Sequence, residues 1–374
     1  MKKNKVKKTK MLDKIKELAK KDSVVYYNKK RYKKRLDWVD VSKAIAMIFI
    51  FLGHWQSQLI GDFAYSFHLQ LFFMVSGFFA LHMQKENFLG MLKKVFFRIA
   101  LPLICWATIS YVIINLDSVD AITGLPDLFF KTGEIQPNYW FLPALIVCIT
   151  IYWGLAKLIK KPWIIVLITY FLNILLGKDA FISLPFNIHD FLEQSPLYYW
   201  YEIDRFFTWG FWYSLGAAVF PLLNSFINLI DSKTKKERVI SRTIGYLSIA
   251  ISIFIFLHNS NFNIINKIGF LRTNFIIIKA IIISFSVFFI SYFLQESKYL
   301  NKIGKNTMIF IGIEFLLHDY ISLTLTVSFN LGIYNFTNSL SLITYVFIMF
   351  LIILPLVDII NKYFPVLNGK TKKR

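Results

Sequence analysis

The stretch "DVSKAIAMIFIFLGHW", residues 40–55, decides the fold, because it is long and apolar yet keeps a lysine and a histidine. An apolar run of about 20 residues can cross the roughly 30 Å hydrocarbon core of a bilayer. Eleven residues separate Lys43 from His54. At 100° per residue, the two side chains lie on almost the same helix face, about 16 Å apart along the axis. Asp40 lies one turn before Lys43 on that face, so the stretch predicts a membrane helix with a polar stripe.

Similar apolar runs recur along the 374-residue chain, which is 56% hydrophobic and 18% aromatic. We therefore expect an all-α membrane protein, a polytopic bundle of about ten transmembrane helices with both termini in the cytoplasm. The predicted spans cover residues 41–60, 63–83, 96–116, 139–158, 162–177, 205–225, 243–258, 274–294, 307–327 and 340–361.

The net charge of +21 is distributed as a membrane topology requires, so no nucleic-acid partner is expected. Sixteen of the 43 Lys and Arg lie in residues 1–36, and most others lie in short gaps between apolar runs. Basic loops stay cytoplasmic under the positive-inside rule. The gaps 117–138 and 178–204, predicted to lie outside, hold nine acidic residues against two lysines. The gap 259–273 departs from this pattern, because it is predicted outside yet carries Lys267 and Arg272.

The same pattern divides the chain into three parts. Residues 1–36 are predicted to be a basic cytoplasmic tail, in which residues 11–20 fit either an amphipathic helix on anionic lipid or a solvated segment. Residues 37–363 are predicted to form the transmembrane domain, and residues 364–374 a second basic cytoplasmic tail. Cys105 and Cys148 both fall in apolar runs, which fits neither a disulfide framework nor a zinc site.

His54 is the first candidate for chemistry, because an ionisable group at its depth usually faces a polar interior. Lys43 either reaches the headgroups or takes part in function. We predict a tight outer turn near Gly61, which places His68 at the depth of His54. His68 is then either a second functional imidazole or a packing histidine bonded to backbone. The Ser76-Gly77 pair predicts a close approach between helices.

Glu314 and His318 form the second candidate pair, because residues four apart share one face of a helix. His318 lies close to the predicted depth of His54. The pair is either an internal ion pair that holds helices together or a second polar wall of the cavity around His54.

Two further groups lie at the predicted membrane surfaces. Arg98 lies just inside the cytoplasmic end of the third span, and Lys93 and Lys94 precede it by about one turn. Fixed cations there can hold phosphates, and positive-inside charge also explains the lysines. On the outer side, aromatic residues and charges gather where sugar binding and an aromatic belt are alternative explanations. The residues in question are Trp140, Glu202, Asp204 and Arg205.

Together these segments resemble the membrane-bound acyltransferase-3 family, in particular its fucose 4-O-acetylase-like branch, over about residues 35–360. Many members have Arg where Lys43 stands, and Lys marks this branch. The motifs that carry the resemblance are D-x-x-K-x10-H (Asp40 to His54), F-H-x-x-x-F-F-x-x-S-G-F (Phe67 to Phe78), R-x-x-x-P (Arg98 to Pro102), W-F-L-x-A-L (Trp140 to Leu145), Arg205 before an aromatic span, and G-K-N-T…H (Gly304 to His318).

The resemblance implies an enzyme that moves acetyl from cytoplasmic acetyl-CoA to a hydroxyl of a cell-surface polysaccharide or its lipid-linked precursor. His54 would be a general base, or would attack first and carry the acetyl group as an acyl-imidazole. Glu314 or His318 would orient it. Lys43, Lys93, Lys94 and Arg98 would hold the CoA phosphates, and His68, Trp140, Glu202, Asp204 and Arg205 would hold the sugar. The resemblance implies neither a metal nor a particular oligomeric state.

The richness in Lys, Ile, Asn and Phe is typical of an AT-rich bacterial source, which favours a bacterial plasma membrane. An alternative class is a transporter or flippase of a polysaccharide precursor or ion-coupled solute, because intramembrane Lys, His and Glu also mark ion pathways. The inverted repeats and Gly/Pro-broken helices of many transporters are not evident in the sequence. A scaffolding protein would have little reason to keep three deep histidines, so the enzyme is favoured.

Overall fold

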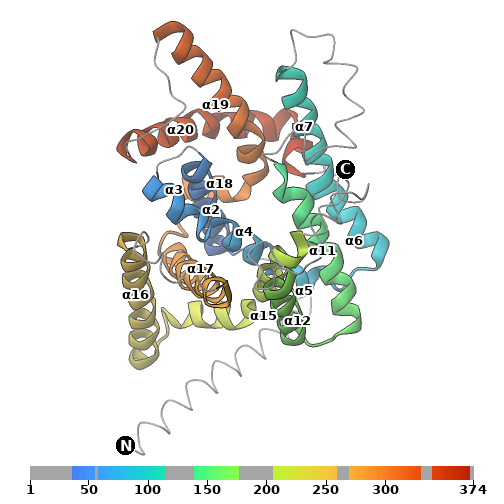
Figure 1. Cartoon of the computed structure of the whole chain (residues 1–374), viewed down its shortest axis with the longest axis vertical. Helices are drawn as coiled ribbons and strands as arrows, with labels where there is room; N and C mark the ends of the chain where they lie inside the picture. Colours follow the sequence, from blue (N-terminus) through green and yellow to red (C-terminus); the bar gives the residue numbers. More distant parts are fainter. Residues whose placement is uncertain are drawn as a thin grey trace, which may run out of the picture.

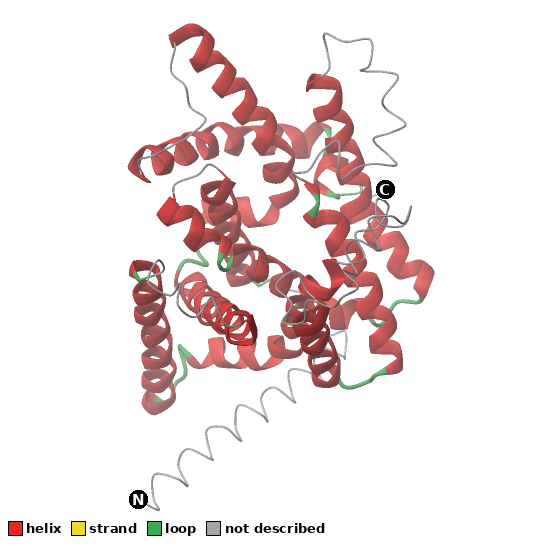
Figure 2. Cartoon of the chain, viewed as in Figure 1, coloured by secondary structure: helices red, strands yellow, loops and turns green. Residues whose placement is uncertain are grey.

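The computed structural model describes residues 36–54, 58–114, 139–176, 205–258, 269–329 and 339–370, and no strand occurs in these ranges (Figure 2). The predicted amphipathic segment 11–20 and the candidates Glu202 and Asp204 lie outside them. The all-α class is therefore confirmed for the described part of the chain.

Helices follow the predicted spans closely. The first half contains α2 (Asp37–His54), α3 (Gln58–Tyr65), α4 (His68–Gly77), α5 (Ala80–Met83), α6 (Phe88–Val95), the π-helical turn η1 (Phe96–Ala100), α7 (Leu101–Ile114), α11 (Phe141–Leu158) and α12 (Pro162–Leu176). The second half contains α15 (Arg205–Leu229), α16 (Lys235–Leu257), α17 (Gly269–Phe293), α18 (Lys298–Lys305), α19 (Thr307–Phe329), α20 (Ser339–Tyr363) and the 3-10 turn η4 (Pro365–Asn368).

Seven helical segments in the described ranges are long and apolar enough to cross a membrane. They are Ile60–Met83, Phe88–Ile113, Phe141–Leu158, Arg205–Leu229, Lys235–Leu257, Thr273–Phe293 and Leu340–Tyr363. Two further apolar helices, Pro162–Leu176 and Thr307–His318, are shorter. A multi-pass membrane protein is thus supported, while ten crossings and cytoplasmic termini stay predictions.

The helix α2 lies in the middle of the bundle, where Figure 1 shows it beside α4, with α16 and α17 on one side and α7 and α11 on the other. Twelve of its 18 residues are buried, including the charged Asp40. By contrast, α16 exposes large apolar side chains such as Leu247, Phe254 and Leu257, as a lipid-facing helix does. The polar stripe of α2 is therefore set inside the protein and not against lipid.

Helices α4 and α15 cross closely because each contributes a glycine to the contact. A Cβ added to Gly77 would overlap the Tyr213 carbonyl, and one added to Gly216 would overlap the Met74 carbonyl. Apolar burial gives helices little reason to associate inside lipid, so small residues that let backbones meet provide the packing. The close approach predicted at Ser76-Gly77 is confirmed.

A second close contact joins α18 to the start of α2. A Cβ on Gly304 would overlap the Asp40 carbonyl, and Lys305 Nζ lies 3.3 Å from Asp37 Oδ1. This contact gives Gly304, the first residue of the G-K-N-T…H motif, a packing role beside the polar stripe of α2.

Residues 364–370, here named the C-terminal strap, fold back over the bundle. Asn306 Oδ1 accepts hydrogen bonds from Asn361, Asn368 and Lys370 at 2.8, 2.6 and 3.1 Å. Trp106 Nε1 donates to the Leu367 carbonyl at 2.9 Å. At the end of the strap, Gly369 has φ of 63°, a left-handed conformation that suits glycine. The strap thus ties α7, α20 and the start of α19 together.

We predict that Gly77→Ala lowers the melting temperature of the protein in detergent, whereas Gly154→Ala does not. The first change forces a methyl group into the Tyr213 backbone, while a Cβ at Gly154 meets nothing within 4 Å. Overpacking of this kind costs roughly 1–3 kcal/mol. Thermal unfolding followed by intrinsic fluorescence measures the difference, and equal melting temperatures for the two variants would contradict the tight crossing.

Candidate active site

His54 and Glu314 form a close side-chain pair between α2 and α19. The distance from His54 Nδ1 to Glu314 Oε1 is 2.7 Å, and the side chains are 25% and 1% exposed. His54 is the last residue of α2, and its ring also lies 5.1 Å from the ring of Phe315. The structure thus brings together two of the three predicted catalytic residues, which are 260 positions apart.

This geometry defines how the imidazole is held. A neutral imidazole that donates Nδ1–H to a carboxylate keeps its basic lone pair at Nε2, as in the familiar triad arrangement of hydrolases. Glu314 Oε2 is buried and has no hydrogen-bond partner among the described residues. The pair can therefore orient a base and still accept one further hydrogen bond at the carboxylate.

His318, one turn after Glu314, is buried, and its Nδ1 lies 2.6 Å from the Tyr345 hydroxyl of α20. Of the two alternatives for Glu314 and His318, the structure does not show the internal ion pair, because the Glu314 carboxylate pairs with His54. Of the two residues expected to orient His54, Glu314 is the one in contact with it. His318 instead joins α19 to α20 beside the pair.

His68 lies next to the same site, at the start of α4. Its ring is fully buried, and its Nδ1 donates to the Ala64 carbonyl at 2.5 Å, which leaves Nε2 as an acceptor. A Cβ on Gly53 would lie 3.6 Å from His68 Cε1, so His68 sits at the depth of His54 as predicted. His68 Nε2 has no hydrogen-bond partner in the described ranges. Such buried polar atoms call for a bound partner such as a hydroxyl or water.

The connection between His54 and His68 differs from the prediction. The expected tight turn near Gly61 is wrong, because residues 58–65 form the helix α3. A turn at Ser66 and Phe67 separates α3 from α4, and both helices belong to the apolar helical segment Ile60–Met83. Tyr65, at the end of α3, places its ring 5.1 Å from that of His68 and is 50% exposed. The short helix therefore adds a phenol beside the two imidazoles.

Trp140 and Arg205, both predicted to bind substrate, are in direct contact. The Arg205 guanidinium carbon lies 4.1 Å from the centre of the Trp140 ring, and Trp209 continues the aromatic group at 5.7 Å from Trp140. Phe73 of α4 stacks on Trp209 at 4.9 Å. This cluster therefore reaches α4 little more than one turn after His68.

Tyr139 joins this aromatic group to α19. Its hydroxyl bonds Ser110 of α7 at 2.9 Å and donates to the Gly312 carbonyl at 3.2 Å. Gly312 precedes Glu314 by two residues, and a Cβ there would overlap the Trp106 ring. Tyr139 and Trp106 were not among the sequence candidates. Tyr139 could have been found from the sequence, because it directly precedes the W-F-L motif. No sequence motif marks Tyr345.

The predicted phosphate-binding cations occupy the other end of α2 and the stretch before α7. Lys43 Nζ lies 2.7 Å from the buried Asp40 carboxylate. Lys94 Nζ lies 2.6 Å from Glu86 Oε1 on the protein surface. Lys93 and Arg98 are exposed, and Arg98 belongs to the π-helical turn η1. Turns of this kind occur frequently at functional sites. Among the described residues, no group of three or more His, Cys, Asp or Glu could hold a metal ion.

An imidazole–carboxylate pair inside a bundle of membrane-length helices defines a membrane protein with a candidate site for proton transfer. The model of the family described as an acyltransferase domain, acyltransferase-3, matches residues 36–361. The chain therefore belongs to the acyltransferase-3 family, and together with its apolar helices this indicates a multi-pass membrane acyltransferase. Comparisons with curated proteins and with solved structures gave no match.

We predict that Glu314→Gln lowers acyl transfer by about 10²–10⁴-fold, the usual contribution of acid–base catalysis. The amide keeps the shape of the side chain but removes the charge that stabilises a protonated His54. Asp358→Asn is the matched control, because Asp358 is a 73% exposed carboxylate on α20 paired with Lys302. Transfer of a labelled acyl group measures both variants, and equal rates in the two would rule out this role for Glu314.

Proposed function

We propose that this protein is an integral-membrane O-acetyltransferase that moves acetyl from cytoplasmic acetyl-CoA to a hydroxyl of a cell-surface polysaccharide or its lipid-linked precursor. Membership of the acyltransferase-3 family supports the transferase class. The observation that carries the proposal is the 2.7 Å contact between His54 and the buried Glu314. We place the protein in the fucose 4-O-acetylase-like branch and in a bacterial plasma membrane.

In the direct route, His54 Nε2 takes the proton of the acceptor hydroxyl, and the oxygen attacks the acetyl carbonyl. The carbon–sulfur bond breaks, and the CoA thiolate leaves and receives the proton from His54. In the two-step route, Nε2 attacks the thioester first, the carbon–sulfur bond breaks and CoA leaves as the thiolate. The acceptor oxygen then attacks the acetyl carbonyl, the bond from the acetyl carbon to Nε2 breaks, and the hydroxyl proton passes through the freed imidazole to the thiolate. The Glu314 carboxylate supports both routes, because it stabilises positive charge on the ring and fixes the tautomer.

The donor would approach along α2. CoA phosphates would bind at the inner end near Lys43, Lys93, Lys94 and Arg98, and the thioester would reach His54 about 16 Å further along the helix. Lys43 already pairs with Asp40 at 2.7 Å, so a phosphate would share this cation with the carboxylate. Arg98 is exposed and well suited to bidentate phosphate contacts.

The acceptor would bind at the outer end of the same bundle. His68 Nε2 is a buried acceptor near His54, and a sugar hydroxyl is a suitable donor for it. The Trp140 face and the Arg205 guanidinium, 4.1 Å apart, would hold the sugar ring and any acidic substituent. Glu202 and Asp204 remain candidates for the same role.

Thioester turnover by the purified full-length protein tests the proposal directly. With labelled acetyl-CoA in detergent, we expect release of CoA that falls by at least about 10²-fold in His54→Ala. His258→Ala is the control, because His258 lies beyond the end of α16, where its Nδ1 bonds the Phe254 carbonyl. Solute accumulation in proteoliposomes without thioester cleavage would instead identify a transporter.

For the donor site, we expect Lys43→Ala to raise the KM for acetyl-CoA and Lys43→Arg to have a mild effect. Lys43→Ala also breaks the pair with the buried Asp40, and breaking a buried pair typically costs about 3–5 kcal/mol. The double variant Asp40→Asn/Lys43→Ala removes both charges and so separates donor binding from stability. A normal KM in the double variant, or equal losses in Lys43→Ala and Lys43→Arg, would remove Lys43 from the phosphate site.

A further inference from the structure

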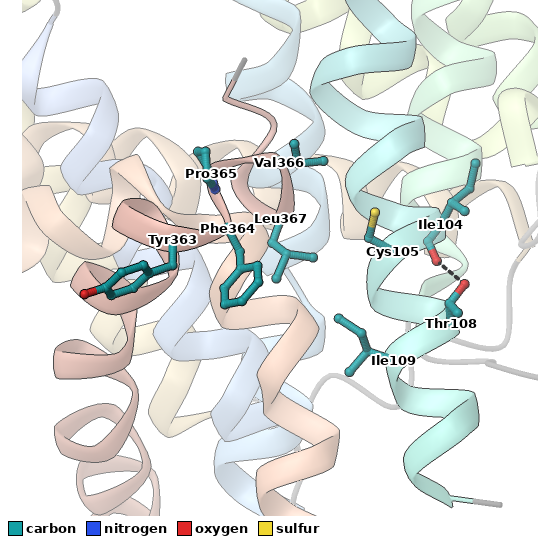
Figure 3. A pocket seen from close by; sticks show the side chains of 9 residues that line it. All are labelled: Ile104, Cys105, Thr108, Ile109, Tyr363, Phe364, Pro365, Val366 and Leu367. Atoms are coloured by element: carbon teal, nitrogen blue, oxygen red, sulfur yellow. Dashed lines mark hydrogen bonds between the residues drawn. The ribbon is translucent and has the colours of Figure 1, made fainter. Parts of the chain in front are cut away.

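An apolar pocket lies on the edge of the bundle, away from His54. It has a volume of about 630 Å³ and opens between α7 and the C-terminal strap (Figure 3). One wall comes from Ile104, Cys105, Thr108 and Ile109, and the other from residues 363–367. Trp106 of the same helix points elsewhere, because its ring packs on Gly312 and its indole donates to Leu367. The pocket therefore lies on the side of α7 that faces away from His54 and Glu314, and it is separate from that pair.

The walls select an apolar ligand. The one side-chain hydroxyl on the α7 wall, that of Thr108, already donates to the Ile104 carbonyl at 2.8 Å (Figure 3). The pantetheine arm of CoA carries two amides, and burying an amide without a partner is costly. An unbranched hydrocarbon chain has no polar group that would need a hydrogen-bond partner in the pocket. The volume of this pocket lies within the 300–1,000 Å³ range of ordinary ligand pockets, so it accommodates a substantial part of such a chain.

The mouth of the pocket carries positive charge and aromatic rings. Tyr363 and Phe364 are 60% and 61% exposed, as expected for rings at a membrane interface. Lys362 Nζ lies 5.0 Å from the Tyr363 ring centre. The strap ends at Gly369 against the Arg98 carbonyl, and the exposed Lys370 follows. Cations at this level attract the anionic headgroups of a bilayer.

We propose that this pocket is a binding site for one acyl chain of an anionic phospholipid, whose headgroup lies at Lys362. The proposal rests on the proposed function, which puts Arg98 at the cytoplasmic end of the bundle. Gly369 of the strap meets the Arg98 carbonyl, so the strap lies at the same end. A lipid-linked sugar acceptor would instead have to reach His54 from the outer half of the bilayer. The bound chain fills the space between α7 and the strap, and so supports the strap on Trp106 and Asn306.

Cys105 provides a natural reporter for this site, because it lines the pocket and is half-buried, whereas Cys148 is fully buried. The full chain in maltoside micelles is titrated with palmitoyl-oleoyl phosphatidylglycerol or with the matching phosphatidylcholine. Alkylation of Cys105 by N-ethylmaleimide is followed by peptide mass spectrometry. We expect phosphatidylglycerol to protect Cys105 at an about fivefold lower mole fraction, the effect of one interfacial cation.

Lys362→Ala should abolish this preference, and Lys298→Ala, an exposed lysine on α18, should keep it. Equal protection by the two lipids, or no protection by either, overturns the proposal. Protection by undecaprenyl phosphate at a lower mole fraction than phosphatidylglycerol also overturns it, and assigns the pocket to a polyprenyl carrier. The assay needs no catalysis, so a protein that lacks thioester turnover but shows the lipid preference refutes the proposed function alone.

Discussion

The structure depends on a carboxylate that is almost completely removed from solvent. Glu314 is 1% exposed in a bundle of apolar helices, where an unpaired charge is very costly. The imidazole of His54, 2.7 Å away, compensates it. This contact is possible only if α2 occupies the centre of the bundle and α19 lies against it at a fixed depth. The two helices are held there by close backbone contacts and polar anchors, which are effective inside lipid. Gly304 meets Asp40, Gly312 meets Trp106, and Asn306 binds the strap.

The helical periodicity of the sequence was sufficient to predict several of these relations. One unbroken helix does carry both Lys43 and His54, His68 does lie beside His54, and Gly77 does mark a close crossing. These features depend on local spacing, which a sequence displays directly. The membrane-length apolar runs predicted the class of fold for the same reason.

Other features depend on contacts between distant segments, which spacing does not encode. Gly61 suggested a turn by its intrinsic preference, but it packs toward the Gly53 carbonyl inside an ordered helix. Tertiary packing determines that Glu314 pairs with His54 and not with His318. It likewise determines that His318 pairs with Tyr345. The composition of residues 364–374 predicted a basic cytoplasmic tail, and nothing in its sequence indicated that Asn368 and Gly369 fasten the described part of it to the bundle.

The central position of α2 has a consequence for biogenesis. The ribosome makes α2 before the helices that enclose it, and the residue that pairs with His54 follows 260 positions later. Until α19 emerges, the charged face of α2 has to be sheltered by an insertase or remain at the bilayer surface, because lipid alone disfavours it. A chain stalled before residue 307 would therefore lack the helix that supplies Glu314, and the polar face of α2 would stay open to membrane quality control.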